Sequence, residues 1–329
     1  MKAIVYTKYG SPDVLQLKEV EKPVPKDDEL LVRVKATSVN RTDCANLTAK
    51  PFIMRFPLGL LKPKNQILGT EFAGDIEAIG KDVTTFNVGE KVFGFFDGIL
   101  SSYAEFLCLS EDKGLSTMPK GISYEQAAVS IEGAHYAYNT INKVDFKKGE
   151  KAIVNGASGG IGSATVQLLV YYGVEVTAVC NTKNIDLIKS LGARKVIDFE
   201  NEDFTQDNEK YEYVFDSVGK STFGKCKRLL KPGGVYISSE LGPYLQNIFF
   251  SLATAIFGNL PAQSGKKVKF PYPPNIKRSV LLIKNLIEEG KFKSVIDRSY
   301  PFEQIPAAFR YVLKGQKTGN VVITIKNEL

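Results

Sequence analysis

A glycine-rich run in the middle of the chain, Asn155-Gly-Ala-Ser-Gly-Gly-Ile-Gly162, has the residue types and the spacing of a phosphate-binding turn. The apolar residues 152–154 precede it, and a helical pattern follows from Ala164 to Tyr172. A strand that turns tightly into a helix directs backbone N–H groups and the positive end of the helix dipole toward one point, and glycines keep side chains away from that point. The run therefore predicts a pyrophosphate-binding loop, with an ordinary glycine-rich turn as the alternative.

The spacing within this loop fits two dinucleotide-binding patterns. Ala157-x-Gly159-x-x-Gly162 matches the general fingerprint with alanine at the first glycine, and Gly156-x-x-x-Gly160-x-Gly162 matches the loop of short-chain dehydrogenases. That second family also has a Tyr-x-x-x-Lys pair, and no tyrosine of this chain has a lysine four residues later. We therefore adopt the first pattern, with cofactor contacts expected from Ala157, Ser158, Gly159, Gly160, Ile161 and Gly162.

The end of the next strand distinguishes between the two nicotinamide cofactors. An acidic residue about 20 residues beyond the glycines usually binds the ribose hydroxyls of NAD. Here that position falls in Cys180-Asn-Thr-Lys-Asn184, which contains no acid. A carboxylate would repel a 2′-phosphate, whereas amide, hydroxyl and ammonium groups donate hydrogen bonds to it. The run also suits the start of a helix, and this is compatible with a prediction of NADPH bound near Cys180, Asn181, Thr182 and Lys183, with Cys180 as a packing thiol.

The elements that position these residues form two patterns. Residues 1–122 contain short apolar or alternating runs punctuated by proline and glycine, which indicate a compact β-rich domain. Residues 123–142 are helical in pattern, and strands then alternate with helices up to residue 238. This βαβ alternation predicts a parallel, doubly wound sheet, which binds ligands at the carboxyl ends of its strands. A last strand over residues 321–325 is expected to rejoin the first domain.

Length and composition are those of a soluble protein with two domains. The chain has 329 residues, of which 43% are hydrophobic and 24% are charged, so it can bury sizeable cores. Its cysteines lie far apart, which predicts reduced thiols in a cytoplasmic protein rather than a disulfide framework. No secretion signal is expected, because Lys8 interrupts the N-terminal apolar stretch. The four cysteines are Cys44, Cys108, Cys180 and Cys226.

Two features bear on possible partners. The formal net charge of +7 suits nucleic acid or an anionic membrane, but the lysines are scattered apart from one cluster at residues 266–269. We therefore favour a mildly basic surface that holds a phosphorylated cofactor. Residues 245–260 carry no charge and are too short to cross a bilayer. A buried helix or a subunit contact is expected there, and a substrate lid or a membrane-surface segment is the alternative.

Six motifs occur in order along nearly the whole chain, at residues 23–36, 69–74, 155–162, 190–193, 216–219 and 231–234. In residue type and order they resemble the medium-chain dehydrogenase/reductases and, more narrowly, their zinc-free quinone oxidoreductase branch. The resemblance implies an α/β protein with a GroES-like substrate domain from residues 1–122 and 266–329, a Rossmann domain from residues 123–265, a cleft at their junction, and a homodimer. It adds three residues to the expected cofactor contacts: Ser217, Val218 and Gly219.

The positions that hold zinc in the alcohol dehydrogenases carry other residue types here. The resemblance places Asn40 and Thr70 at two ligand positions and Glu132 near the third. An amide and a hydroxyl are poor zinc ligands, and the four-cysteine structural zinc lobe is missing. The single histidine, His135, is expected to pack in the core or support the site. We therefore expect no metal, and a zinc-type alcohol dehydrogenase becomes the remote alternative.

Without a metal to stabilise an alkoxide, the substrate must already be electrophilic, as a quinone or an α,β-unsaturated carbonyl is. Asn40 and Thr70 are expected to donate hydrogen bonds to the enolate-like charge that hydride addition creates, and Asp43 to orient them or relay a proton. The alternative is that Asn40 and Asp43 cap a helix that begins there. The apolar residues 51–64 are expected to line or cover a hydrophobic pocket, or to form a packed connection.

These inferences favour an NADPH-dependent reductase of small hydrophobic electrophiles. A second hypothesis is a protein that binds the cofactor but has little turnover, because some relatives are lens proteins or bind RNA. No RNA-binding motif is present in this chain, so nucleic acid is not the expected partner. A third hypothesis is a peripheral membrane enzyme that uses residues 245–260 and the neighbouring lysines.

Overall fold

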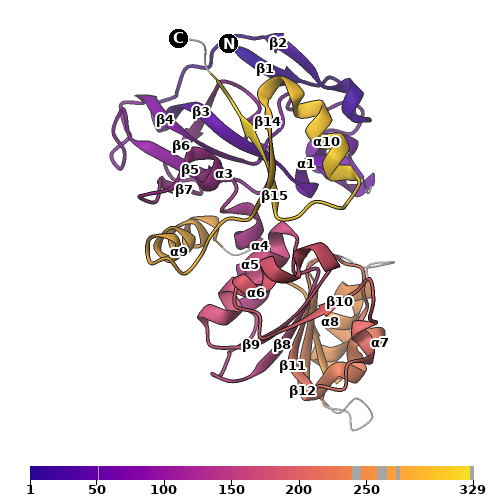
Figure 1. The fold of residues 1–329 in the computed structure, drawn as a ribbon. Coiled ribbons are helices and arrows are strands. Elements are labelled where there is room, and N and C mark those ends of the chain that lie inside the picture. The colour runs from indigo at the N-terminus through magenta and orange to yellow at the C-terminus, as the bar shows by residue number, and fades with distance from the viewer. Residues whose placement is uncertain (51, 239–245, 258–264, 272–274, 327–329) are drawn as a thin grey trace. The chain divides into compact units, whose positions relative to one another are not determined.

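The computed structural model describes the chain except for residues 51, 239–245, 258–264, 272–274 and 327–329, and it leaves undescribed the side chains of residues 53, 246 and 253–257. The chain forms two compact units. Unit 1 consists of Met1–Glu132 and Asn275–Leu329, and unit 2 of Gly133–Pro274. Unit 1 therefore contains both the indigo start and the yellow end of the chain in Figure 1.

Along the chain, the boundaries between the units fall at residues 132/133 and 274/275, whereas the sequence suggested 122/123 and 265/266. Two short elements account for the difference. Helix α3 (Tyr124–Ala128) packs on strands of unit 1. Strand β13 (Lys267–Lys269) pairs in parallel with a strand of unit 2. Packing partners far along the chain thus decide to which unit each element belongs.

The expected helix over residues 123–142 is divided in two. Ser123 caps α3, since its hydroxyl accepts a hydrogen bond from the backbone N–H of Gln126 at 3.3 Å. At the other end, the hydroxyl of Ser130 donates to the carbonyl of Ala127 at 2.8 Å and so satisfies a terminal carbonyl. Helix α4 (Glu132–Ile141) then begins separately.

A seven-stranded sheet is the framework of unit 1. Its strands follow the order β14-β15-β3-β4-β5-β7, and β6 pairs with β3. The last strand pairs antiparallel with β3, which confirms that the chain end rejoins the first part. The strands are β3 (Glu29–Val39), β4 (Glu71–Ile79), β5 (Lys91–Phe95), β6 (Phe106–Ser110), β7 (Leu115–Thr117), β14 (Ile296–Pro301) and β15 (Asn320–Thr324).

The core of unit 1 lies between this sheet and the helices that pack near it. Leu30, Val32 and Val34 alternate along β3 and are fully buried, as a strand with one face on the core requires. Phe309 on helix α10 belongs to the same apolar cluster. Beside α10 (Ile305–Leu313), the unit contains α1 (Arg41–Thr48), α2 (Arg55–Leu58), α9 (Ile276–Glu288) and a small sheet of β1 (Lys2–Val5) and β2 (Gln16–Glu19).

Unit 2 is built on a parallel sheet with the strand order β10-β9-β8-β11-β12-β13. This is a doubly wound order: β9 and β10 extend the parallel sheet on one side of β8, and β11, β12 and β13 extend it on the other. The fold class predicted from the βαβ alternation is therefore confirmed. Besides β13, the strands are β8 (Lys151–Asn155), β9 (Glu175–Cys180), β10 (Lys195–Asp198), β11 (Tyr211–Asp216) and β12 (Leu230–Ser238). The helices besides α4 are α5 (Gly160–Tyr171), α6 (Ile185–Ser190), α7 (Phe223–Cys226) and α8 (Gln246–Phe257).

The uncharged run 245–260 contains α8, and residues 245 and 258–260 lie outside the described part. Phe250 packs on the apolar core of unit 2, whereas Phe249 and Leu252 are 67% and 62% exposed. One face of α8 is thus buried, as a core helix requires, and another is exposed. In the part of the chain that the structure describes, every helix is too short or too polar to cross a membrane.

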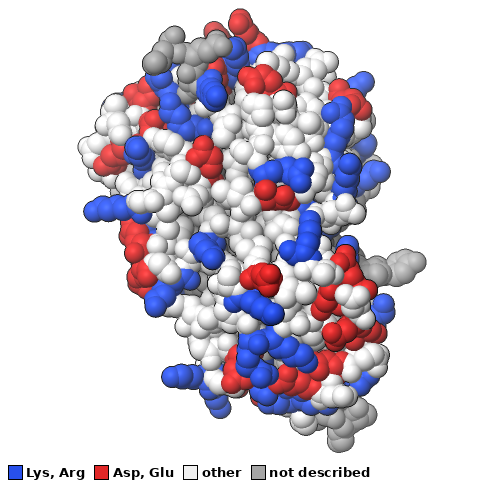
Figure 2. Space-filling model, viewed as in Figure 1, with Lys and Arg blue, Asp and Glu red and all other residues white. Residues whose placement is uncertain are grey.

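Basic and acidic side chains alternate over the face shown in Figure 2. Ion pairs between basic and acidic residues occur in unit 2, as between Lys195 and Asp207 at 2.8 Å and between Lys151 and Glu209 at 2.6 Å. The net positive charge is therefore dispersed on this face among residues of both signs.

Candidate functional site

The glycine loop connects β8 to α5 in the strand-turn-helix arrangement predicted from the sequence. Gly156 has φ +78°, in the left-handed region that favours glycine. A Cβ on Gly162 would lie 2.1 Å from the carbonyl oxygen of Gly156, so only glycine fits there. A Cβ on Gly159 would make a single contact, 3.6 Å from the carbonyl oxygen of Gly156, which is an ordinary van der Waals distance, so the space around this position is otherwise open.

Helix α5 presents its amino end to this open space. Gly159 is its N-cap and has no side chain to cap it, and the first intrahelical bond runs from the N–H of Ser163 to the carbonyl of Gly159 at 2.9 Å. The N–H groups of the three residues between them have no partner inside the helix. A pyrophosphate fits this arrangement in charge and in size, because donors and a helix dipole converge where side chains are lacking.

Asp216, at the end of β11, holds the neighbouring loop of residues 217–219 in place. Its Oδ1 accepts from Nδ2 of Asn155 at 3.0 Å, and its Oδ2 accepts from the N–H of Ser221 at 3.0 Å and from the hydroxyl of Tyr236 at 3.1 Å. The N–H of Ser217 donates to the carbonyl of Asn155 at 3.1 Å. Two of the predicted cofactor segments are thereby joined at the carboxyl ends of β8 and β11.

The segment after β9 lies beside two acids that counting along one strand did not detect. The hydroxyl oxygen of Thr182 lies 2.5 Å from Oδ2 of Asp198 and 2.7 Å from Oε2 of Glu200, so its one hydrogen can be given to either carboxylate. The N–H of Thr182 donates to the same Glu200 oxygen at 3.1 Å. The hydrogen bond from Thr182 lowers the pKa of Asp198, which is therefore ionised at neutral pH. Lys183 remains exposed.

Cys180 lies at the end of β9 and is fully buried. Burial raises the pKa of its thiol to about 11, so the thiol is protonated at neutral pH. A protonated, buried thiol is a poor nucleophile, which agrees with a packing role.

The three predicted catalytic residues lie together in unit 1, and all three are buried. The backbone N–H of Asn40 donates to Oδ2 of Asp43 at 2.8 Å, where β3 ends and α1 begins. The capping alternative is thus realised through the Asp43 carboxylate. The side chain of Asn40 points elsewhere, since its Nδ2 lies 3.0 Å from Oε1 of Glu71 and 3.0 Å from Oε2 of Glu132.

Glu132, the first residue of α4, is the centre of this cluster. Its Oε2 accepts from the hydroxyl of Thr70 at 2.9 Å, and its Oε1 accepts from the hydroxyl of Thr42 at 2.6 Å. Its backbone N–H donates to Oε2 of Glu71 at 2.8 Å. Asn40 and Thr70 were expected to donate to the substrate, but in the structure their donor hydrogens are directed at carboxylates of the protein.

The carboxyl groups of this cluster are held in an environment that disfavours their charge. Burial, followed by the nearby Glu132, raises the pKa of Glu71 and of Asp43 well above the usual range. Burial also raises the pKa of Glu132, although hydrogen bonds from Thr42, Thr70 and Asn40 lower it in part. Lys317 is half-buried; burial lowers its pKa, while the carboxyls of Glu132 and Glu71 raise it. Oδ1 of Asp43 is buried without a hydrogen-bond partner.

The donor set of this cluster does not fit zinc. Zinc takes thiolate, imidazole or carboxylate ligands, whereas the nitrogen of Asn40 and the hydroxyl of Thr70 act as hydrogen-bond donors to Glu132. No group of three or more His, Cys, Asp or Glu residues that could hold a metal ion occurs within the described ranges. His135 is fully buried on α4, with Nε2 3.2 Å from Nδ2 of Asn139, as expected of a core residue.

The apolar segment after α1 carries two exposed aromatic rings. Phe52 and Phe56 are 62% and 66% exposed, and their rings meet edge to face at 6.3 Å. The hydroxyl of Tyr9 donates to the carbonyl of Gly59 at 2.7 Å and fixes the following turn. Leu60 and Leu61, further along the same segment of unit 1, are also exposed.

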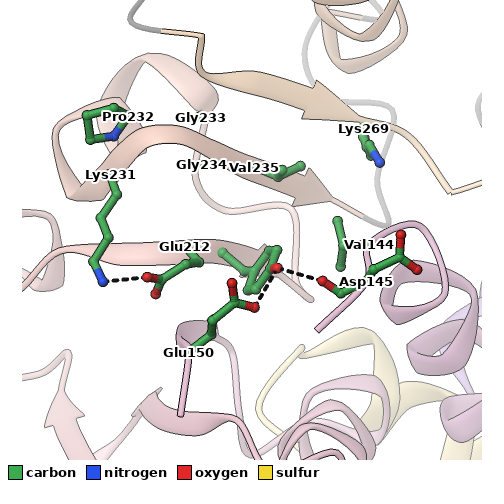
Figure 3. A pocket seen from close by; sticks show the side chains of 11 residues that line it. Val144, Asp145, Glu150, Glu212, Lys231, Pro232, Gly233, Gly234, Val235 and Lys269 are labelled. Atoms are coloured by element: carbon green, nitrogen blue, oxygen red, sulfur yellow. Dashed lines mark hydrogen bonds and ion pairs between the residues drawn. The ribbon is translucent and has the colours of Figure 1, made fainter. Parts of the chain in front are cut away.

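Unit 2 also has a hollow of about 360 Å³, shown in Figure 3. Glu150, Glu212 and Lys231 line it at the amino ends of β8, β11 and β12. The hydroxyl of Tyr213 donates to Oε2 of Glu150 at 2.9 Å, and Lys231 forms an ion pair with Glu212. Doubly wound sheets bind their ligands at the carboxyl ends of the strands, so this hollow is not the predicted cofactor site.

Four residues with contacts to the predicted site were not assigned a role from the sequence. Glu71, Thr42, Asp198 and Glu200 carry ordinary surface residue types, and only the fold brings them to the site. A signal was present for two of them. Glu71 directly follows the predicted Thr70 in the chain, and Thr42 lies two residues after the predicted Asn40.

The sequence matches two family models and many known proteins. The models are the alcohol dehydrogenase GroES-like domain, over residues 26–120, and zinc-binding dehydrogenase, over residues 191–323. The 2-methylene-furan-3-one reductase of Solanum lycopersicum is 31% identical over 98% of this chain and 79% of its own length. The chloroplastic NADPH-dependent alkenal/one oxidoreductase of Arabidopsis thaliana is 28% identical over the same shares. The solved quinone oxidoreductase of Coxiella burnetii has the same fold, with a TM-score of 0.84, 24% identity and 99% of each chain covered.

Proposed function

Because this chain belongs to the medium-chain dehydrogenase/reductase superfamily, in its quinone oxidoreductase branch, we propose that it reduces quinones or α,β-unsaturated carbonyl compounds with NADPH and without zinc. The chain is an oxidoreductase of a family that uses nicotinamide cofactors. The names of the two relatives given above describe a 2-methylene-furan-3-one reductase and an alkenal/one oxidoreductase. The observation that carries the proposal is the open space before α5, which Gly159 leaves free at the point where the helix N–H groups converge.

The residues of unit 2 fit the cofactor as follows. The N–H groups of Gly160, Ile161 and Gly162 would hold the pyrophosphate, and residues 217–219 would line the neighbouring strand end. Lys183 and Asn181 would donate to a 2′-phosphate. The bound, reduced nicotinamide would supply the hydride.

Zinc independence is supported by the pairing inside the buried cluster. Asn40 and Thr70 donate to Glu132, so neither presents a lone pair in the arrangement that a tetrahedral zinc site needs. The family model described as zinc-binding covers residues 191–323 and contains none of these three residues. Dialysis against a chelator is expected to leave turnover unchanged, and a loss of activity that added zinc restores would overturn this part of the proposal.

The most direct test is NADPH oxidation with a panel of quinones, 2-alkenals and enones, and with simple alcohols and ketones as controls. Turnover of the conjugated acceptors alone is expected, because charge from hydride addition then spreads into a conjugated system. Tight NADPH binding without turnover of any acceptor would favour the alternative, a cofactor-binding protein. Equal catalytic efficiency with NADH would reject the NADPH preference.

We further propose a cytoplasmic homodimer, on the resemblance to the family. Analytical ultracentrifugation tests the dimer, and a monomer at micromolar concentration would exclude it. A peripheral membrane enzyme is the competing proposal, because α8 exposes Phe249 and Leu252. Co-flotation with anionic liposomes at low salt would favour it.

A further inference from the structure

The carboxyl group of Glu132 lies between two threonine hydroxyls. Thr42 contacts its Oε1 at 2.6 Å, and Thr70 contacts its Oε2 at 2.9 Å. Thr42 is half-buried, whereas Glu132 and Thr70 are 4% and 1% exposed. Three groups in hydrogen-bond contact thus lead from a partly accessible hydroxyl to a fully buried one.

Each group in this row can both give and accept a hydrogen bond. A hydroxyl donates one proton and accepts through its lone pairs, and a carboxyl does the same when it is protonated. Reversing the direction of the two hydroxyls therefore needs only a rotation about each C–O bond. The amide of Asn40, by contrast, donates to Glu132 and to Glu71 and holds the two carboxyls in place.

The surroundings favour a proton on this cluster. Glu71 is fully buried and shares the Asn40 amide with Glu132, so two negative charges in this buried cluster would repel each other. The other charged or titratable groups that face the cluster come from several elements: Arg41, Asp43 and Cys44 on α1, Tyr103 before β6, and Lys317 before β15. Among them Asp43 adds negative potential and Lys317 adds positive potential, and burial raises the pKa of both glutamates.

We propose that Glu132 stores the proton that completes the reduction, that Thr70 passes it toward the substrate, and that Thr42 reloads Glu132 from solvent. The proposal rests on the reductase function proposed above. It assigns Glu132 and Thr42 as proton-relay residues, and it changes the role expected of Thr70 from a fixed donor to a carrier.

The relay balances the reaction. A reduced nicotinamide bound by unit 2 would supply the hydride. Its addition at the β-carbon of an enone would form a C–H bond and shift the C=C electrons onto the carbonyl, which leaves an enolate. The hydroxyl of Thr70 gives its proton to the enolate carbon and takes the Glu132 proton in the same movement. The Glu132 carboxylate then takes a proton at Oε1 from Thr42, which takes one from solvent. A half-turn of the carboxyl group returns this proton to the side of Thr70 for the next turnover. With a quinone, the same proton completes the hydroquinone.

The test compares wild type with Glu132→Gln, Thr42→Val and the matched control Thr48→Val on the same helix. General acid catalysis contributes about 10²–10⁴-fold, so kcat with an alkenal is expected to fall at least about 100-fold in Glu132→Gln. In Thr42→Val the fall should be smaller, with an increased solvent isotope effect, and Thr42→Ser should restore the rate. Thr48→Val, whose hydroxyl donates to the carbonyl of Cys44 at 2.9 Å, should be unchanged.

Infrared spectroscopy supplies a readout that does not need the cofactor. At neutral pH wild type should show the carbonyl stretch of a protonated carboxyl, and Glu132→Gln should lose or shift it. An unchanged kcat in both Glu132→Gln and Thr42→Val, or the absence of that band in wild type, would overturn the relay. A wild type with no turnover of any acceptor would instead refute the proposed reductase, and the band would still report on the stored proton.

Discussion

The preference between NADPH and NADH is expected to depend on Glu200, which is hydrogen-bonded to Thr182. The hydroxyl oxygen and the N–H nitrogen of Thr182 lie 2.7 and 3.1 Å from Oε2 of Glu200, so a negative charge lies beside the proposed 2′-phosphate donors Asn181 and Lys183. This charge opposes a phosphate and favours the ribose hydroxyls of NADH. Lys183, which is exposed next to it, has the opposite effect.

Glu200→Gln is therefore expected to raise the preference for NADPH over NADH by about tenfold in kcat/KM, which corresponds to about 1.4 kcal/mol. Lys183→Ala should lower the preference. Glu202→Gln, two residues further on and exposed, is the matched control and should change neither. An unaltered ratio in Glu200→Gln would show that the carboxylate does not face the bound phosphate.

The buried carboxyl of Glu132 makes the free energy of unfolding depend on pH. Burial raises the pKa of Glu132 in the folded protein above its pKa in the unfolded chain. The contribution of this carboxyl to the free energy of unfolding is therefore fully present below the unfolded pKa of about 4.3 and is lost as pH rises through the folded pKa. Glutamine does not titrate, and its amide can accept from Asn40 and donate to Thr42. Glu132→Gln should therefore gain stability relative to wild type as pH rises from about 5 to about 9.

Glu77→Gln on β4 should behave in the opposite way. Burial raises the pKa of Glu77, but hydrogen bonds and charge from Lys22 and Arg33 outweigh this and lower it below its usual value. The wild-type advantage over Glu77→Gln is then present above the unfolded pKa and is lost as pH falls through the folded one. Urea unfolding midpoints of wild type and both variants, measured across pH, check this prediction. If the two variants changed relative to wild type in the same direction with pH, the opposite pKa shifts assigned to Glu132 and Glu77 would be contradicted.

The sequence indicated some of these residues and not others, for a physical reason. Asn40 and Thr70 were identified because they occupy positions within local motifs. Their contacts to Glu132 span 92 and 62 residues, so they depend on how the chain of unit 1 folds. Similarly, Glu200 reaches Thr182 only because β9 and β10 are neighbours in the sheet. Side-chain pairing across such distances follows from the fold, not from spacing along the chain.

At the level of elements, the turn from β8 to α5 was predictable because its determinants are local. The apolar strand, the glycines and the helical pattern all lie within residues 152–172. The elements that were misplaced, α3 and β13, are short, and their unit is determined by distant partners. Two glycines in this turn are needed for different reasons: Gly162 because the backbone is too close for a Cβ, and Gly159 because the proposed pyrophosphate needs the space. Substituting each one separately distinguishes these reasons.

Gly162→Ala should destabilise unit 2, because its Cβ would lie 2.1 Å from the carbonyl oxygen of Gly156. Overpacking of this kind costs about 1–3 kcal/mol. Gly159→Ala should leave stability nearly unchanged, since its φ of −77° suits alanine and no atom lies within 3.6 Å of the new Cβ. It should weaken NADPH binding, because the methyl group fills the space proposed for the pyrophosphate.

Thermal unfolding without cofactor and NADPH titration of each variant distinguish these effects. The expected pattern is a lower Tm for Gly162→Ala and an unchanged Tm with a higher Kd for Gly159→Ala. Gly159→Ala with wild-type affinity would place the pyrophosphate elsewhere and would remove the main support for the proposed function.

At the scale of the molecule, the two units have separate apolar cores. The cluster around Phe72 and Phe309 contains only residues of unit 1, and that around Val214 and Tyr236 only residues of unit 2. All the residues proposed to hold the pyrophosphate and the adenosine phosphate belong to unit 2. Ligand binding stabilises the part of a protein that it contacts, so NADPH should protect one unit more than the other.

Hydrogen–deuterium exchange with and without NADPH measures this difference. At a concentration 100 times Kd, binding contributes about 2.7 kcal/mol, so core amides of β8, β9 and β11 that exchange through opening of unit 2 should slow about 100-fold. Amides of β3, β4 and β15 in unit 1 should slow far less, because the proposed phosphate contacts do not include them. In Gly159→Ala at the same NADPH concentration, the slowing should shrink in proportion to the lost affinity. Equal protection of both units would mean that the cofactor is held as strongly by unit 1, and the assignment of binding to the turn before α5 would have to be abandoned.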